Sequence, residues 1–305
     1  MLVWNQAPVC RDAELSMVNG MLSRRRLLQG LLAVPFIGIA SAAVPRRVAI
    51  LDWGLAELAL ALGVTPVAVS APDWYRKLIN MPAMSTDVVD IGLLFQPNLE
   101  ALYALRPDTI LVTPQHALLK PILERIAPVV TLPVNGLAGY TAATKQMAAL
   151  FDRKPQADAL IQHLQQQMAQ TRDIAVSISC PLFLAFTVNS LHVRLLGEGC
   201  VPGDVLAGCG IRNAWREPFP PGGESLVELT QIAQTDARLL LLTADDDERR
   251  AAQSWQTSPL WQRLPLTSGN RLRLAPTHFS SAGALVTASR FAAMLGVLLT
   301  GWDHD

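Results

Sequence analysis

The feature that most constrains the fold of this chain is an alternation of short apolar runs with stretches of helical periodicity. Four runs rich in β-branched residues in the first half predict strands, at 47–53, 65–70, 108–114 and 129–134. Helices are predicted between them over 54–63 and 118–126. Because strands that alternate with helices pair in parallel, this half predicts an open α/β sheet.

A second α/β series follows a long helix with one apolar stripe, predicted over 156–175 and introduced by Lys154-Pro155. It contains predicted strands at 180–188, 237–244 and 271–276, and predicted helices at 202–209 and 283–300. The predicted fold class is α/β, with two α/β lobes of mainly parallel sheets joined by one long interlobe helix. The predicted boundaries are 43–153 for the N-terminal lobe, 154–175 for the helix and 176–305 for the C-terminal lobe.

The N-terminus reads as an export signal over residues 1–42. An arginine cluster in "SRRRLLQ" (23–29) precedes an uncharged apolar run that ends in Ala40-Ser41-Ala42, small residues that a signal peptidase accepts. The arginine pair predicts the twin-arginine route, with the Sec route as the alternative. We expect the true translation start at Met17 or Met21. The run is too short to span a bilayer and no cysteine follows it, so no membrane anchor is expected.

Composition argues against a nucleic-acid partner and against a disulfide within one helix. Lys plus Arg and Asp plus Glu each number 25, which leaves no basic field for nucleic acid. Three cysteines follow the predicted signal, at positions 180, 200 and 209. Cys200 and Cys209 flank a predicted helix, and a helical separation of about 13 Å exceeds the reach of a disulfide. Buried, unpaired thiols are therefore expected.

Motifs that carry catalysis are missing from the sequence. It contains no dinucleotide fingerprint, Walker loop, G-x-S-x-G elbow, H-E-x-x-H or paired C-x-x-C, and its five histidines lack metal-ligand spacing. We therefore do not expect an enzyme. Polar and aromatic residues instead follow the predicted strands, where open α/β sheets bind ligands, at Trp53, 73–76, 113–117, 213–224 and 276–283. They predict a cleft with apolar walls for a bulky ligand.

Several of these segments carry a family resemblance. "DIGLLFQPNLE" (90–100), the Arg106-Pro107-Asp108 that follows it and "GIRNAW" (210–215) resemble the periplasmic ferric hydroxamate binding proteins of enterobacterial siderophore uptake. The similarity covers essentially all of residues 43–305. It implies a monomeric periplasmic binding protein of the siderophore and cobalamin type, with no catalysis and no resident cofactor. Its cargo would be a ferric siderophore, with the hydroxamate type favoured, delivered to an inner-membrane ABC permease.

The chain departs from this family within the expected cleft. Leu94 stands where the family has an arginine, which removes a charge-assisted hydrogen bond of about 1.5–3 kcal/mol. Arg76 is the candidate replacement, and His116 stands where the family has a tyrosine. The candidate ligand-binding residues are Trp53, Trp74, Tyr75, Arg76, Leu94, His116, Trp215, His278 and Phe279. For the aromatic residues the alternative is a role in packing, and for Arg76 it is a solvated surface position. No residue is expected to ligate the iron directly.

Other readings stay open from the sequence. His116 and His278 would suit opposite axial positions of a haem iron, so a haem or cobalamin carrier of the same fold is one alternative. The alternative is that His116 and His278 are hydrogen-bonded residues of the cleft that contact no metal. A third reading is a periplasmic enzyme that processes siderophores. Glu124 and Glu228 lie near the family's permease-docking carboxylates, although exposed helix glutamates are more often only solvated.

Overall fold

The computed structural model describes residues 44–176, 180–189, 191–267 and 271–302. The predicted signal peptide lies outside these residues. The part from Val44 onward is one compact unit. Within the described residues, no helix has both the length and the apolar composition needed to cross a membrane.

The first lobe is built on a parallel sheet with the strand order β3-β2-β1-β6-β7. Its strands are β1 (Val48–Ile50), β2 (Ala68–Val69), β3 (Val89–Asp90), β6 (Thr109–Val112) and β7 (Val129–Thr131). The central strand β1 pairs with both neighbours, so that Ala49 lies between Ala68 and Ile110. β1 and β6 are buried along their whole length, as expected of strands covered on both faces. The four strands predicted for this half are confirmed.

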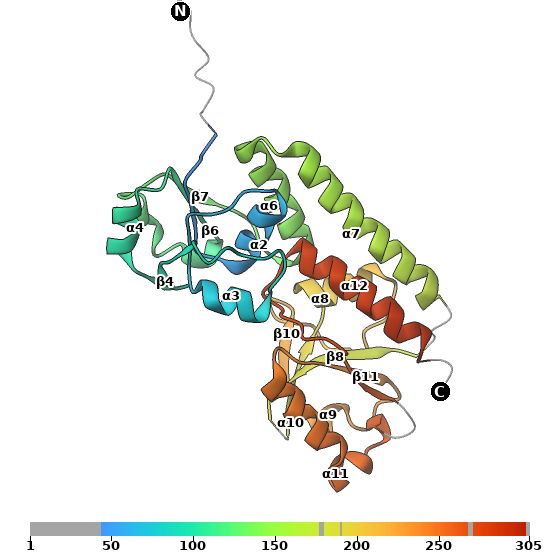
Figure 1. Ribbon diagram of the computed structural model, residues 1–305. Helices are drawn as coiled ribbons and strands as arrows, with labels where there is room; N and C mark the ends of the chain where they lie inside the picture. Colours follow the sequence, from blue (N-terminus) through green and yellow to red (C-terminus); the bar gives the residue numbers. More distant parts are fainter. Residues whose placement is uncertain (1–43, 177–179, 190, 268–270, 303–305) are drawn as a thin grey trace, which may run out of the picture. The chain divides into compact units, whose positions relative to one another are not determined.

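Helices and one hairpin surround this sheet (Figure 1). They are α2 (Trp53–Ala61), α3 (Pro72–Leu78), α4 (Leu99–Leu105), the 3-10 turn η1 (Pro114–His116), α5 (Lys120–Leu123), α6 (Gly136–Phe151), and the hairpin of β4 (Gly92–Leu93) and β5 (Gln96–Pro97). Trp53 begins α2 and does not end β1, because the Asp52 carboxylate caps the helix by accepting from Leu55 N at 2.9 Å. The segment 73–76 was predicted as a loop and is helical, since Pro72 occupies the first helical position of α3.

The second lobe contains a mixed sheet with the order β10-β9-β8-β11-β12. Its strands are β8 (Leu182–Thr187), β9 (His192–Leu196), β10 (Glu224–Glu228), β11 (Arg238–Leu242) and β12 (Leu272–Leu274). β11 runs parallel to β8 and β12, whereas β9 is antiparallel to β8 and β10. The connection from β8 to β9 is too short for a crossover helix and therefore forms a hairpin. The two-lobe α/β prediction is confirmed, but this sheet is only half parallel.

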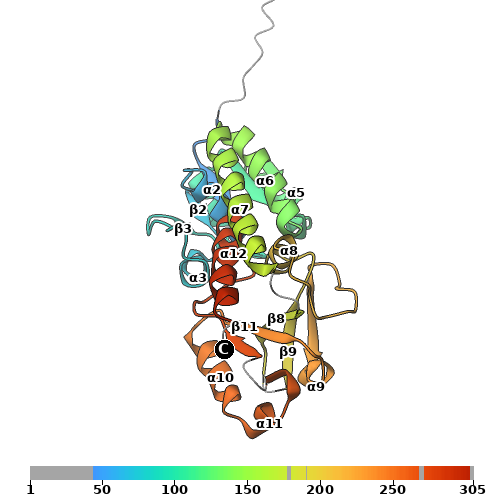
Figure 2. The same cartoon turned by 90° about the vertical axis from the view of Figure 1, so that its right-hand side faces the viewer.

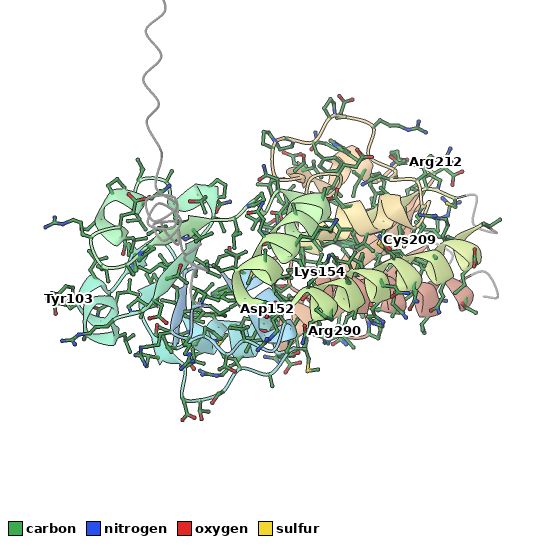
Figure 3. All side chains as sticks on the ribbon, turned by 90° about the horizontal axis from the view of Figure 1, so that it is seen from above. Tyr103, Asp152, Lys154, Cys209, Arg212 and Arg290 are labelled. Carbon is green, nitrogen blue, oxygen red and sulfur yellow. The ribbon has the colours of Figure 1, made fainter. Side chains whose placement is uncertain are left out.

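The remaining helices are α7 (Lys154–Ala175), α8 (Val201–Gly208), α9 (Leu229–Ile232), α10 (Asp246–Gln256), α11 (Pro259–Gln262), the 3-10 turn η2 (Pro265–Thr267) and α12 (Leu285–Thr300). α10 and α11 lie beside each other (Figure 2). α7 packs along α12 (Figure 1), and the Thr171 hydroxyl on α7 donates to Ala292 O at 2.7 Å. Figure 3 shows Lys154 at the beginning of α7 and Arg290 on α12. The long helix spans the predicted range 154–175, so that Lys154 and Pro155 form its first turn and do not merely precede it.

Two carboxylates join helices that are far apart in the sequence. One lies on α2 and contacts α12, and the other lies on α8 and contacts α6. Glu57 on α2 is fully buried and accepts from three main-chain N–H groups at the start of α12, at 2.8–3.1 Å, and from the Thr287 hydroxyl. Asp204 on α8 accepts from Leu137 N at 2.7 Å, at the start of α6, and from Gly199 N at 2.8 Å. Both carboxylates satisfy N–H groups that a helix leaves without partners. Neither contact was predicted.

The three cysteines in the described residues are free thiols. Cys200 and Cys209 are buried at the two ends of α8, as expected from their spacing, and Cys180 is half-buried. Burial raises the pKa of the Cys200 and Cys209 thiols to about 11. The prediction of unpaired cysteines is confirmed.

Candidate ligand-binding site

A cavity of about 420 Å³ opens at the carboxyl ends of β1 and β2; we call it the first-lobe hollow. It is lined by Trp53, Ala71, Trp74, Leu93, Leu94, Phe95 and Gln96. Gln96 is the only lining residue with a polar side chain apart from the two indoles, so the walls are almost wholly apolar. An apolar cavity at this edge of a parallel sheet matches the usual location of ligands in open α/β folds.

The backbone between β2 and α3 shapes this hollow. Ala71 has φ 46°, in the left-handed region that residues with a Cβ atom seldom adopt. Its N–H donates to Gly92 O at 2.8 Å, and so the end of β2 is fastened to the β4–β5 hairpin. This contact brings Trp74 on α3 to the same cavity as Leu94 in the hairpin.

Two indoles form part of the wall. Trp53 is half-buried, and its Nε1 donates to Ser70 O at 2.8 Å, which fixes the ring. Trp74 is 50% exposed, and the Lys77 ammonium lies 5.2 Å from its ring centroid. Lys77 also forms an ion pair with Asp245, at 3.0 Å. The hollow therefore presents flat aromatic surface on which an apolar ligand can stack.

Leu94 lines the hollow, whereas His116 supports it from beneath. The His116 ring is 1% exposed and stacks on Phe95 at a centroid distance of 5.1 Å. Thr113 N–H donates to Nδ1 at 3.2 Å, so the proton of the neutral ring is on Nε2, which donates to Leu94 O at 3.1 Å. Both ring nitrogens are therefore occupied. In this arrangement the His116 ring presents almost no free surface to the hollow, so its contact with a ligand stays a prediction.

Tyr75 and Arg76 do not line the hollow. Tyr75 is fully buried, and its hydroxyl donates to Pro82 O at 2.9 Å, so its ring presents no surface to the hollow. The Arg76 guanidinium pairs with Asp73 at 2.7 Å and donates to Ser85 O at 2.6 Å. Successive helical residues point about 100° apart, and α3 therefore turns these two side chains away from the direction of Trp74. The Arg76 guanidinium is held by these partners in this arrangement, and its role as a replacement for an arginine at position 94 stays a prediction.

Trp215 borders a second cavity, of about 400 Å³, which we call the second-lobe hollow. It is lined by Glu198, Asn213, Trp215, Glu217, Pro218 and Phe219. Asn213 holds the loop, since its Oδ1 accepts from Trp215 N and its Nδ2 donates to Leu196 O, both at 2.9 Å. Trp215 also borders a neighbouring cavity of about 540 Å³ that includes Arg216. Glu198 was missed from the sequence because it lies outside the segment 213–224, which holds the other lining residues.

His278 and Phe279 lie at neither hollow. His278 Nε2 is 2.9 Å from Asp246 Oδ1, and its Nδ1 is 3.5 Å from the Thr243 hydroxyl. Phe279 is buried against Phe291, with ring centroids 4.8 Å apart. The cavity that both residues border has a volume of about 20 Å³, room for one water molecule. The Phe279 ring belongs to the core, and the predicted ligand contacts of His278 and Phe279 stay predictions.

Comparison with known proteins identifies the family. Residues 48–277 match the family model described as periplasmic binding protein. This chain is a member of the periplasmic binding protein family.

This periplasmic binding protein has relatives that match it nearly from end to end. It is 27% identical to the iron(3+)-hydroxamate-binding protein FhuD of Escherichia coli, over 92% of this chain and 98% of the relative. It is 28% identical to the achromobactin-binding periplasmic protein of Dickeya dadantii, over 83% of this chain and 87% of the relative. The solved structure of siderophore-binding FhuD from Vibrio cholerae with Fe³⁺-Desferal superposes with a TM-score of 0.73 at 26% identity, covering 84% of this chain and 98% of that one. The resemblance inferred from the sequence is confirmed.

The two expected docking carboxylates lie on the surface of this periplasmic binding protein. Glu124 is exposed at the end of α5, with Lys120 Nζ 3.7 Å away. Glu228 is exposed at the N-cap of α9 and accepts from the Thr230 hydroxyl at 3.2 Å. Glu228 therefore caps a helix, and neither side chain is buried. Their docking role stays a prediction.

The described part of the chain gathers no group of three or more His, Cys, Asp or Glu side chains that would hold a metal ion. The site consists instead of aromatic and aliphatic walls with a few polar groups. Such walls can bind a preformed complex by its surface, with the chemistry of its metal centre left to the ligand itself.

Proposed function

We propose that this chain is the periplasmic substrate-binding component of an ABC importer, which captures a ferric siderophore, of the hydroxamate type, and delivers it to an inner-membrane permease. The observation that carries the proposal is an aromatic-walled hollow in a chain that matches an iron(3+)-hydroxamate-binding protein over 92% of its length and superposes on a siderophore-binding protein bound to Fe³⁺-Desferal. The iron arrives saturated by the oxygens of its chelator. The almost wholly apolar walls of the first-lobe hollow suit such a cargo.

The chelate is held by its carbon framework. Trp53, Trp74 and Leu94 in the first-lobe hollow and Trp215 and Phe219 in the second-lobe hollow supply the contact surface. The packing of α7 along α12 and the two capping carboxylates resist wide bending of the lobes. Lobe motion on binding is therefore small compared with proteins hinged on flexible strands.

The test is a titration of intrinsic tryptophan fluorescence with ferric hydroxamates, ferric catecholates and haemin in parallel. A ferric hydroxamate quenches saturably at micromolar concentration or below. Trp74→Ala weakens this binding about ten-fold, because it removes a half-exposed stacking surface. The matched control is Tyr103→Ala on α4, whose ring is 70% exposed and points away from the lobe (Figure 3). The proposal is contradicted if no ferric hydroxamate quenches the fluorescence. It is also contradicted if Trp74→Ala binds the ferric hydroxamate as tightly as the wild type does.

The same samples separate binding from chemistry and from haem transport. A binding protein returns the chelate unchanged, so chromatography after incubation recovers the added compound. An altered chelate would instead indicate a siderophore-processing enzyme. The structure does not favour haemin binding through His116, because both ring nitrogens are hydrogen-bonded and the ring is buried. A Soret band on haemin addition would reinstate that alternative.

We further propose export by the twin-arginine route through residues 1–42, and lobes bounded at 43–153 and 176–305 about the helix 154–175. Lysine substitution of both Arg24 and Arg25 leaves unprocessed protein in the cytoplasm if the route is correct. Processing of that variant at the normal rate would indicate the Sec route.

Docking on the permease is assigned to Glu124 and Glu228, with the protein acting as a monomer. Glu124→Arg and Glu228→Arg reverse the charge at exposed sites. They are expected to reduce uptake of the siderophore by cells while affinity for it in solution stays unchanged. Loss of affinity in both variants, or normal uptake, contradicts the assignment.

A further inference from the structure

The first-lobe hollow offers no uncompensated positive charge. Leu94 lines it where a cation would meet a chelate, and the two nearest cations in α3 are already paired. Arg76 is bound to Asp73 and to two backbone carbonyls. Lys77 lies against Trp74, but its ammonium is 3.0 Å from Asp245. An anionic ligand would have to break an existing ion pair to gain a cation here.

The second-lobe hollow is negative. Glu198 and Glu217 line it, both are exposed, and neither forms an ion pair with any of the described residues. Arg216, the neighbouring cation, borders the adjacent cavity instead. Trp215 and Phe219 complete the hollow as uncharged aromatic walls. Two unpaired carboxylates beside a ligand favour positive charge on it and disfavour negative charge.

We infer that this site selects ferric chelates by net charge, accepting neutral and positively charged chelates and rejecting anionic ones, with Glu198 and Glu217 as the residues that set the selectivity. The inference rests on the proposed function. A ferric ion bound by three hydroxamates is neutral, whereas the same ion bound by three catecholates is triply negative. The charges of the hollows therefore divide iron chelates into two groups before any detail of shape is considered.

The experiment uses one chelate in three charge states. A linear ferric trihydroxamate with a free terminal amine is positive, its N-acetyl derivative is neutral, and its N-succinyl derivative is negative. Because all three share one iron centre and one backbone, differences in affinity report the charge of the pendant end. We expect dissociation constants to rise in that order, with a total span of about ten-fold at low ionic strength that shrinks in concentrated salt.

Variants locate the effect. In the double variant Glu198→Gln, Glu217→Gln the ratio of dissociation constants between the negative and the positive derivative shrinks. Its logarithm falls to less than about half of the wild-type value, because the two carboxylates supply most of the negative potential in the hollow. The control Glu100→Gln removes an exposed glutamate on α4 and keeps the full span. Leu94→Arg raises affinity for the negative derivative and lowers it for the positive one.

The outcomes separate the inference from the function beneath it. Binding of all three derivatives with equal affinity, or tightest binding of the negative one, overturns charge selection and leaves siderophore capture intact. A full span in the double variant overturns the assignment to Glu198 and Glu217. Binding of none of the three overturns the proposed function, and the inference with it.

Discussion

Removal of the Glu57 carboxylate tests how the two helical layers of this protein are joined. In Glu57→Ala, three main-chain N–H groups at the start of α12 and the Thr287 hydroxyl lose their acceptor. All four donors lie in a buried or partly buried region, where water replaces the carboxylate poorly. We therefore expect a large loss of stability from a single side chain far from either hollow.

The magnitude follows from the donors. Each buried donor left without an acceptor costs about 1–3 kcal/mol, and these costs do not add in full because part of the space rehydrates. Burial disfavours the ionised form of Glu57 and so raises its pKa, and this cost of burying the carboxylate offsets part of the gain from its hydrogen bonds. The expected loss in the free energy of unfolding is about 3–4 kcal/mol, a large share of the roughly 5–15 kcal/mol typical of a protein.

The assay is equilibrium unfolding in urea, with helix content followed by circular dichroism. Thr287→Val, which removes only the hydroxyl donor, is expected to cost about 1 kcal/mol. Glu100→Ala, on the exposed side of α4, is the control and is expected to change stability by less than about 0.5 kcal/mol. A loss below about 1 kcal/mol in Glu57→Ala would refute the argument that these donors depend on one acceptor.

Glu57 also makes stability depend on pH. Because the folded pKa is raised, the native state keeps a proton on Glu57 over a range in which the unfolded chain has released it. Stability therefore falls as pH rises from the ordinary glutamate pKa toward the folded one. Glu57→Gln, which has no titratable group at this position, is expected to remove this decrease of the free energy of unfolding with pH. If the pH dependence is unchanged in Glu57→Gln, the pKa of Glu57 is not raised in the folded protein.

The remaining predictions concern the other capping carboxylate, the acid limb of stability and the thiols. Asp204→Ala leaves two N–H groups without their acceptor, so we expect a loss of about 1–2 kcal/mol in urea unfolding, and no loss would contradict the capping role. Hydrogen bonds from two backbone N–H groups before β1 lower the pKa of Asp108, so its contribution is present above the ordinary pKa of aspartate and disappears as pH falls below it. Asp108→Asn should therefore flatten the acid side of the pH–stability curve, whereas an unchanged curve would argue against it. Cys200 and Cys209 have pKa values of about 11, and we expect both to resist alkylation at pH 8 until the chain is unfolded; rapid reaction of the folded protein would show that they are not buried thiols.

Some of the fold could be predicted because the signals are local. The β-branched runs that became β1 and β6 are fully buried, and α7 buries one stripe of an otherwise exposed helix, so in each case the sequence periodicity matches the structure. α6 was not predicted, although it is a long helix that begins after Asn135, a residue type that often precedes a helix. The hairpin of β8 and β9 was also not predicted, because strand direction follows from the length of a connection and not from apolar composition.

The site shows the same division. Position at the end of a strand pointed to Trp53 and Trp74, which line one hollow because parallel strands end at one edge of their sheet, whereas Leu94 in the same hollow was named only from the family resemblance. That rule does not say which way a side chain turns, and the structure buries His116 and Tyr75 in the core beside the same hollow. Rotation about a helix axis and the contacts of each ring decide this.

By itself, the sequence determined the α/β class, the family and the strand ends from which a ligand site is built, because periodicity and motifs are properties of neighbouring residues. Only the tertiary structure decided the charge of the site. It paired Arg76 and Lys77 with carboxylates and left Glu198 and Glu217 facing a cavity without cations. It also placed Glu57 at the start of a helix more than two hundred residues later. No local pattern encodes such a contact, since its free energy depends on donors and solvent exclusion supplied by distant parts of the chain.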